Sequence, residues 1–323
     1  MWKQLFVSFS SMNSFRKCPR FYYWKHIRRL EKRVFKLPFI VGRIMHHGIQ
    51  TLLSRPDKAL DAIKEIYKEE AQKARKEFLL SPIEEEDLAA QQFAVIGMLD
   101  AYRRQYSQFL KATKHVATER VLQYELNKNV VVVGKIDNVL QNQSHDWTYE
   151  LKNLKSLDMD RISGIKTDPQ SGLYFEVYNR LAKQKKWEKL HGMLYQIIRK
   201  PSIRQKKTES RREFLVRLQE WYSSGEGGMK FHLERTKGSF ISGAAVMNTV
   251  DKVSKQMLSC KEQDDYYQDF SRCISEWDKC QFYGLCHGDE KKEMKLLQIR
   301  KPYKVSEEKE ELDEDVANVV DEK

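Results

Sequence analysis

The stretch that decides the fold of this chain is residues 121–154, VLQYELNKNVVVVGKIDNVLQNQSHDWTYELKNL. β-Branched residues fill its centre, and polar residues at 127–129 and 141–145 divide it into three segments. Short segments of this composition, bounded by polar turns, are typical of strands that follow one another through tight connections. The stretch therefore predicts a three-stranded β-meander.

The second and third predicted strands carry charged residues close to one another. Asp137 lies on the second strand, and Glu150 and Lys152 lie on the third, where alternation places both on one face and Leu151 in the core behind them. Two neighbouring carboxylates repel each other and favour a hard divalent cation, to which the Leu151 carbonyl would add a third oxygen. Lys152 would orient a water or steady charge on a phosphate. The simpler alternative is an exposed ion pair.

Helical periodicity lies on both sides of the meander. Upstream it covers residues 40–54 and 58–112, with Pro56 between the two and Pro82 expected to break the longer one, while residues 8–33 begin as a helix and continue as a basic and aromatic run. Downstream we expect helices at 170–185, 209–223 and 239–257, and strands at 189–199 and 230–234. This order predicts an α/β domain with helical extensions at both ends.

Four regions follow from these patterns. They are an N-terminal helical region at 1–117, a core of sheet and helix at 118–200, a C-terminal helical region at 201–288 and an acidic tail at 289–323. The tail has few large apolar residues, so we expect it to be disordered.

Charge is unevenly distributed along the chain. The 323 residues carry a net charge of +12, but those from Val305 onward contribute −7, which leaves +19 on the rest. A body this basic indicates a polyanionic partner, nucleic acid before a membrane surface, with solubility as the simpler alternative. The tail would solubilise the protein, mimic DNA or bind a basic partner.

Several function classes are excluded by absent patterns. No stretch approaches the roughly 18 consecutive apolar residues of a membrane span. The first residues lack the apolar segment of a signal peptide, so we expect a cytoplasmic protein. No phosphate-binding loop of the form G-x-x-x-x-G-K-[ST] occurs, which excludes a helicase or ATPase motor within this sequence.

Three further motifs surround the charged strands. They are SFSSMNSFRKCPRFYY at 8–23, GRIMH at 42–46 and QSGLY at 170–174. Together with Asp137 and Glu150-Leu151-Lys152, their order and spacing resemble the RecB-like branch of the PD-(D/E)XK nuclease superfamily, including exonucleases encoded by phages. The resemblance runs, with gaps, from about residue 7 to 287.

The resemblance implies a restriction-endonuclease-like core, in which helices flank a mixed central sheet. It implies that His46, Asp137, Glu150 and the Leu151 carbonyl hold Mg²⁺ or Mn²⁺, with Lys152 assisting hydrolysis. In this family, residues in the places of Gln170 and Tyr174 position the nucleic-acid strand. The simpler alternatives are that His46 has a structural role and that Tyr174 is a residue of the core.

The function that the resemblance implies is DNA exonuclease activity in phage or prokaryotic recombination and repair, in a bacterial or phage-infected cell. The DNA would be single-stranded or a duplex end, and a strand-annealing protein or a separate helicase would be the partner. Two alternatives stay open. One is a CRISPR-adaptation nuclease, and the other is a non-catalytic nucleic-acid-binding subunit of a helicase–nuclease complex.

Four of the five cysteines have a distinctive layout, with Cys18 far upstream of Cys273, Cys280 and Cys286. This resembles nucleases of the AddB type, in which four such thiolates bind a 4Fe–4S cluster that holds the chain ends around the fold. The spacing of six residues after Cys273 is longer than the usual two. Zinc on the same sulfurs and unliganded thiols stay open. Cys260 fits no pattern, and we expect a buried thiol there.

Two basic runs would contact a nucleic-acid backbone. The run at 14–33 interleaves basic residues with aromatic ones, which either stack on bases or pack in the core. The second run would line the other wall of a channel or be a solvated loop. It consists of Lys200, Arg204, Lys206, Lys207, Arg211 and Arg212.

Overall fold

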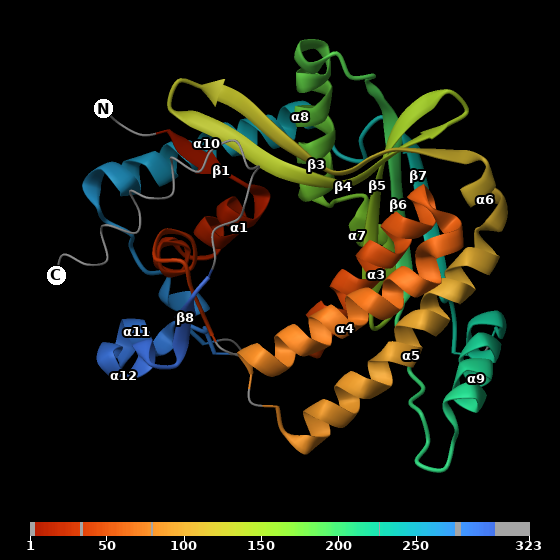
Figure 1. Cartoon of the computed structure of the whole chain (residues 1–323). Coiled ribbons are helices and arrows are strands. Elements are labelled where there is room, and N and C mark those ends of the chain that lie inside the picture. Colours follow the sequence, from red (N-terminus) through yellow and green to blue (C-terminus); the bar gives the residue numbers. More distant parts are fainter. Residues whose placement is uncertain (1–3, 33–34, 79, 226, 275–278, 301–323) are drawn as a thin grey trace. The chain divides into compact units, whose positions relative to one another are not determined.

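The computed structural model describes residues 4–32, 35–78, 80–225, 227–274 and 279–300, and Figure 1 shows the whole chain. Its main sheet is mixed and has the order β1-β4-β5-β6-β7, with β3 also pairing with β4. These strands are β1 (Leu5–Val7), β3 (Thr113–Asn127), β4 (Val130–Asn142), β5 (His145–Leu154), β6 (Leu190–Arg199) and β7 (Phe231–Lys237). The predicted meander is β3, β4 and β5, and the predicted α/β class with a mixed central sheet is confirmed.

The chain forms two compact units. One consists of residues 34–122 and 135–246, and the other of residues 1–33, 123–134 and 247–323. The first of these, which we call the sheet unit, contains the segments predicted to hold the catalytic residues. The second, which we call the cysteine unit, contains all five cysteines.

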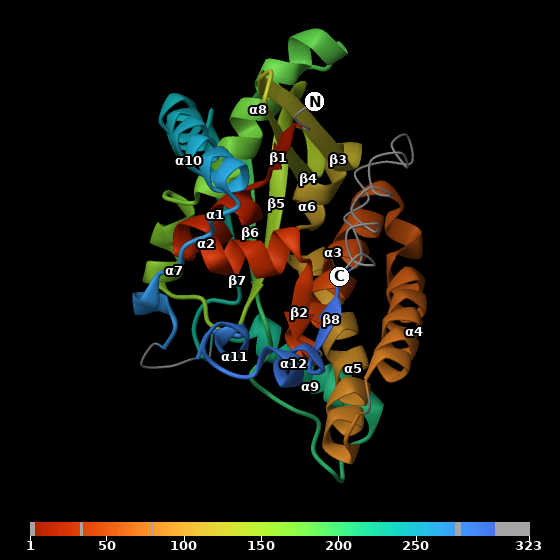
Figure 2. The same cartoon turned by 90° about the vertical axis from the view of Figure 1, so that its left-hand side faces the viewer.

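In the sheet unit, helices cover both faces of β5, β6 and β7. The large core on one face joins Tyr149 and Leu151 of the sheet to apolar side chains of four helices. These helices are α3 (Leu37–Ser54), α4 (Ala59–Glu77), α5 (Pro82–Gln105) and α9 (Arg211–Ser223). On the other face, Tyr195 and Ile197 pack against α7 (Met159–Ile165), and α8 (Pro169–Lys185) also contacts β6. In Figure 2 the sheet separates α7 and α8 from α3, α4 and α5.

Local sequence explains where the helices of this unit begin. Ser81 and Glu84 form a reciprocal capping box, so Pro82 starts α5 as its first residue as well as ending the preceding pattern. Asp168 caps α8 in the same position, again directly before a proline. The short elements η2 (Pro56–Lys58) and α6 (Ser107–Lys111) complete the unit.

The cysteine unit is built from short elements of both chain ends. β1 pairs in parallel with residues 130–132 of β4, and β2 (Leu30–Lys32) pairs antiparallel with β8 (Leu297–Ile299). Its helices are α1 (Phe9–Lys17), α2 (Pro19–Tyr22), the π-helix η1 (Tyr23–Ile27), η3 (Phe270–Arg272), α11 (Tyr283–His287), α12 (Glu290–Met294) and most of α10 (Gly243–Gln263). Trp24, Leu30, Phe282, Leu285 and Leu297 form a small core.

Helices and strands continue further along the chain than the sequence patterns predict. An acidic tail was expected from residue 289, but α12 and β8 occupy 290–294 and 297–299. Burial of Leu297 against Trp24 explains the difference, because one apolar residue among charges has no periodicity to reveal it. Residues 301–323, which hold most of the acidic tail, lie outside the described residues. Among the helices of the described residues, none has the length and hydropathy to span a membrane.

Candidate active site

The candidate active site lies where β4 and β5 stop pairing. Their antiparallel register runs from Asn142–His145 to Asn138–Tyr149, and Asp137 and Glu150 come directly beyond the last pair. β5 continues to pair with β6 through this region. The Leu151 backbone therefore faces the gap on its β4 side, where it hydrogen-bonds both the Asp137 carboxylate and the His46 imidazole.

His46 reaches this point from α3. Its Nδ1 lies 3.3 Å from Asp137 Oδ2, whereas the neighbouring His47 is exposed. Burial lowers the pKa of His46, so its imidazole is neutral at neutral pH. One turn earlier on the helix, a Cβ at Gly42 would meet no described atom within 4 Å. Packing therefore does not require this glycine, which leaves open space beside the histidine.

One carboxylate oxygen of Asp137 makes no hydrogen bond within the part of the chain that the structure describes. Oδ2 is buried, and among the described residues it has no hydrogen-bond partner. Burial also raises the pKa of this carboxyl, with the Lys152 ammonium acting in the opposite direction. A buried acceptor without a partner is costly, and a cation between Oδ2 and a neutral imidazole would satisfy both groups. The donors present therefore fit a divalent cation.

Glu150 and Lys152 form an ion pair on the same face of β5, as alternation predicts. Glu150 is buried, and its pKa is raised to about 7 by that burial and by the charge of Asp137. Burial opposes protonation of Lys152, but the Glu150 carboxylate outweighs it and raises the pKa of the lysine. Within the described residues, no three His, Cys, Asp or Glu side chains are already arranged around one metal position. At this site, the reason is that the Glu150 carboxylate is turned toward Lys152, with which it forms an ion pair.

Two residues that the sequence analysis missed border the site. The register of β5 and β6 places Tyr195 directly opposite Glu150, on the same face. Burial raises the pKa of Tyr195, and the charges of Lys152, Asp168 and Glu150 also act on it. Asp168 caps α8 by accepting the Gln170 N–H at 3.0 Å. The register of the strand at 189–199 against the strand at 148–154 would have identified Tyr195 as a residue of the site. One sequence does not contain that register.

Gln170 and Tyr174 lie one turn apart at the start of α8, as predicted. Tyr174 is half-buried, whereas its neighbours Leu173 and Phe175 are buried, so Tyr174 is not one of the core residues of this helix. Gly172 lies between the two motif residues, and a Cβ there would meet Ile241 Cγ2 at 2.0 Å. This close approach fixes the start of α8. The role of Gln170 and Tyr174 in holding a nucleic-acid strand stays a prediction.

The four cysteines with the distinctive layout line one cavity in the cysteine unit. Cys18, Cys273, Cys280 and Cys286 border it together with Trp24 and other aromatic side chains. Burial raises the pKa of the Cys273 thiol, and the thiols of Cys280 and Cys18 raise it further. Cys260 is buried on α10 and does not line the cavity. The four cysteines line one pocket. Within the described residues, however, no three of these side chains are already arranged around one metal position.

The aromatic residues of the first basic run belong mainly to the core. Phe15, Tyr22 and Trp24 are 2%, 3% and 8% exposed, so they are not available to stack on bases. Lys17 and Lys25 lie 5.0 and 5.5 Å from the centre of the Phe21 ring. Arg33 lies outside the described residues. These three aromatic residues therefore pack in the core and do not stack on bases.

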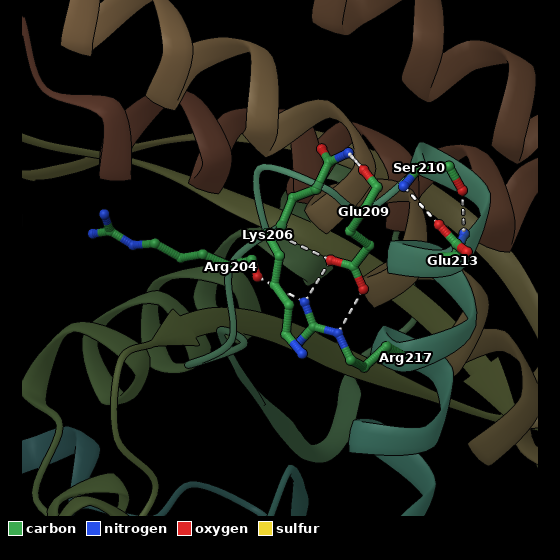
Figure 3. A network of polar contacts seen from close by, with 7 residues as sticks. Arg204, Lys206, Glu209, Ser210, Glu213 and Arg217 are labelled. Carbon is green, nitrogen blue, oxygen red and sulfur yellow. Dashed lines mark hydrogen bonds and ion pairs between the residues drawn. The ribbon is translucent and has the colours of Figure 1, made fainter.

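The second basic run is part of an ordered loop that leads into α9 (Figure 3). The Glu209 carboxylate accepts two hydrogen bonds of 2.7 Å from Arg217 and one of 2.9 Å from the Lys206 backbone. Arg217 also donates to the Arg204 carbonyl at 2.7 Å, while the Arg204 side chain is 86% exposed. The loop is exposed to solvent, and these hydrogen bonds fix its conformation. It is compatible both with the wall of a nucleic-acid channel and with a solvated loop, so the two alternatives stay open.

A mixed sheet with two carboxylates, a lysine and a histidine at the end of a strand pairing is an arrangement compatible with a metal-dependent nuclease. The family model of the PD-(D/E)XK nuclease superfamily matches residues 7–287, and the chain belongs to that superfamily. One similar solved structure is titled "Crystal structure of SSO0001". It is 11% identical, with a TM-score of 0.28, over 67% of this chain and 74% of that one. Among curated proteins, none matches this chain.

Proposed function

We propose that this protein is a DNA exonuclease that hydrolyses phosphodiester bonds with Mg²⁺ or Mn²⁺. The observation that carries the proposal is the orphaned, buried Oδ2 of Asp137, 3.3 Å from Nδ1 of His46 and next to the break between β4 and β5. His46, Asp137, Glu150 and the Leu151 carbonyl would hold the cation. When bound, the cation would lower the pKa of a water and neutralise charge on the phosphate.

The protein's own groups then have distinct tasks. Lys152 is tied to Glu150 in the structure, and its ammonium becomes available once that carboxylate turns toward a cation. Held at the edge of the site, Lys152 Nζ would hydrogen-bond the attacking water or a phosphate oxygen and steady the charge that develops there. Gln170 and Tyr174, on the helix capped by Asp168, would keep the strand in line with that water.

Three variants test the catalytic assignment. Asp137→Asn, Glu150→Gln and Lys152→Met should each lower metal-dependent cleavage by about 10²-fold or more, since each removes a charge that the transition state needs. Thermal unfolding of Asp137→Asn and Glu150→Gln should stay close to wild type, whereas Lys152→Met leaves the buried Glu150 carboxyl without its ion-pair partner and should unfold at a lower temperature. The matched control is Asp61→Asn, because Asp61 is an exposed carboxylate on α4 with a side chain that is 81% exposed. Cleavage retained by all three variants would contradict the proposal.

The preference for ends is supported by the resemblance of residues 8–23 to phage-type exonucleases. A linear duplex, a linear single strand and a covalently closed circle, each labelled internally, separate the modes of cutting. Degradation of the linear forms with an intact circle is the expected result, whereas nicking of the circle would replace the exonuclease by an endonuclease. We place the activity in phage or prokaryotic recombination and repair, in the cytoplasm, alongside a strand-annealing protein or a helicase.

We further propose that Cys18, Cys273, Cys280 and Cys286 hold a 4Fe–4S cluster, with support from their common cavity. They come from both ends of the chain, so the cluster would join segments more than 250 residues apart and stabilise the cysteine unit. Anaerobic purification followed by an absorption spectrum and a metal assay tests this. A broad visible band with about four irons per chain is expected. Zinc without iron would assign the same sulfurs to a tetrahedral zinc site.

A further inference from the structure

One buried N–H donor at the cysteine cavity, and a second one close to it in sequence, have no acceptor among the described residues. The indole Nε1 of Trp24 is buried without a hydrogen-bond partner among the described residues, and the same holds for Nε of Arg20. Trp24 is 8% exposed and lines the cavity. A buried donor that bonds neither protein nor water costs about 1–3 kcal/mol, so the unpaired Trp24 indole in the lining of the cavity indicates that an acceptor belongs there.

Cys286 lines the same cavity as Trp24 and packs against the small core to which Trp24 belongs. Burial raises the pKa of this thiol, and the thiols of Cys280 and Cys18 raise it further, whereas the Trp24 indole and, more weakly, the Arg20 guanidinium lower it. The indole N–H nevertheless makes no hydrogen bond of acceptable geometry with the neutral thiol. A thiol is a weak acceptor, whereas a thiolate carries a full charge and is a strong one.

A second sulfur of the cavity already receives a donor. The backbone N–H of Asp269 points to Cys18 Sγ at 3.4 Å. The donors at these two sulfurs come from η1, α2 and the segment before η3. Donors directed at these sulfurs would favour negative charge on them once a metal is bound, and they act against the burial that raises the pKa of the Cys286 thiol.

We propose that Trp24 donates a hydrogen bond to the Cys286 thiolate of the metal centre, and that this bond, with a smaller contribution from the charge of Arg20, stabilises the negative charge of the thiolate. The inference rests on the proposed cysteine-held cluster and is independent of the nuclease activity. Both residues are positioning residues, because they act on the cluster through a ligand. Hydrogen bonds to the sulfurs are among the factors that set the reduction potential of an iron–sulfur cluster. They favour the reduced form, because it carries one more negative charge.

The test compares anaerobically purified full-length wild type with Trp24→Phe, which keeps an aromatic ring and removes the N–H. Phe21→Leu is the control, because Phe21 lines the same cavity but has no donor. A dye-mediated redox titration followed in the visible band gives the midpoint potential, and the rate of iron loss to a chelator gives retention. Trp24→Phe should make the potential more negative, equivalent to about a tenfold change in the reduction equilibrium, and should lose iron several-fold faster. Arg20→Gln should shift both measurements in the same direction by less.

Each outcome separates this inference from the proposals beneath it. A potential and an iron-loss rate that match wild type, or equal changes in Trp24→Phe and Phe21→Leu, would overturn the donor role and leave the cluster in place. Wild type purified without any metal would remove the centre and the inference together. If the sulfurs hold zinc, the same comparison is made on zinc release, and faster release from Trp24→Phe alone supports the donor role. A loaded protein that does not cleave DNA would overturn only the nuclease.

Discussion

At the scale of single residues, the ion pair between Glu150 and Lys152 compensates for an incomplete site. Asp137 and Glu150 lie side by side in low dielectric, and the pKa of each is raised by burial. Lys152 provides the positive charge on the Glu150 side, but Asp137 Oδ2 has no hydrogen-bond partner among the described residues. The electrostatic balance therefore lacks one cation next to His46, and this deficit is stronger evidence for a metal than the presence of acidic residues alone.

Tyr195 offers a test of how the site is built on the β6 side. Tyr195→Phe should lower the cleavage rate by about tenfold with little change in substrate affinity, because its hydroxyl lies among the charges of Lys152, Asp168 and Glu150. Single-turnover kinetics at saturating DNA measures that rate. The control is Tyr222→Phe, which loses a 2.8 Å hydrogen bond to the Arg199 carbonyl on the opposite face of the sheet. Equal rates for both variants would remove Tyr195 from the site.

His26 should make the stability of the protein sensitive to acid. Burial, and then the charges of Arg300 and Lys25, lower its pKa from 6.5 to about 3, while its Nε2 lies 3.0 Å from Ser14 Oγ. Between those two pH values the unfolded chain binds a proton that the folded protein excludes. Stability is thus complete above pH 6.5 and falls on acidification, by up to about 1.4 kcal/mol per pH unit, until the folded histidine is protonated near pH 3.

The check is urea unfolding of wild type and His26→Gln at several pH values, followed by tryptophan fluorescence. The free energy of unfolding of wild type should fall more steeply than that of the variant between pH 6.5 and 4.5. Above pH 7 the two should differ by a constant amount. Parallel curves over the whole range would show that His26 is not held neutral in the folded state.

At the scale of elements, the strands that carry the site depend on close packing at a single glycine of β6. A Cβ at Gly192 would lie 2.1 Å from the Thr236 backbone oxygen on β7 and 2.4 Å from Trp147 Cζ3 on β5. Gly192→Ala therefore forces strands apart and should destabilise the protein by about 3 kcal/mol. Gly164→Ala on α7 is the control, because a Cβ there meets no described atom within 4 Å and alanine favours a helix.

Thermal unfolding measured by circular dichroism distinguishes the two alanine variants. A melting temperature several degrees below wild type is expected for Gly192→Ala, and one at or slightly above wild type for Gly164→Ala. Comparable losses in both would mean that the separation of β5, β6 and β7 is not what limits stability.

The same scale shows which elements a single sequence can predict. The meander, α3, α8 and α9 follow from strong periodicity and from caps such as Ser210 with Glu213. The three-residue strands β1, β2 and β8 do not, because three residues have no period and their pairing partners are more than 120 residues away. The point at which β4 and β5 stop pairing cannot be predicted from one sequence for the same reason. It follows from pairing on the far side of each strand, which local patterns do not contain.

At the scale of the whole chain, the order of short motifs was more informative than any one of them. The spacing of His46, Asp137, Glu150-x-Lys152 and Gln170 predicted the superfamily that the family model then showed over residues 7–287. Sequence order did not predict the two units, since residues 123–134 belong with both chain ends. Tertiary packing decides to which unit a segment belongs. It can therefore divide a meander whose strands are continuous in sequence.

Net charge leads to a prediction for the full-length protein. Removing residues 305–323 raises the net charge from +12 to +19, so DNA affinity should increase at low salt, because the acidic segment no longer competes with phosphates or repels them. Fluorescence anisotropy of labelled single-stranded DNA with Glu150→Gln protein in EDTA measures binding without cleavage. Several-fold tighter binding by the truncated protein is expected near 50 mM salt, and the difference should fade as salt approaches 1 M, where the screening length is about 3 Å. Equal affinities at low salt would show that the charge of residues 305–323 does not act on the DNA-binding surface.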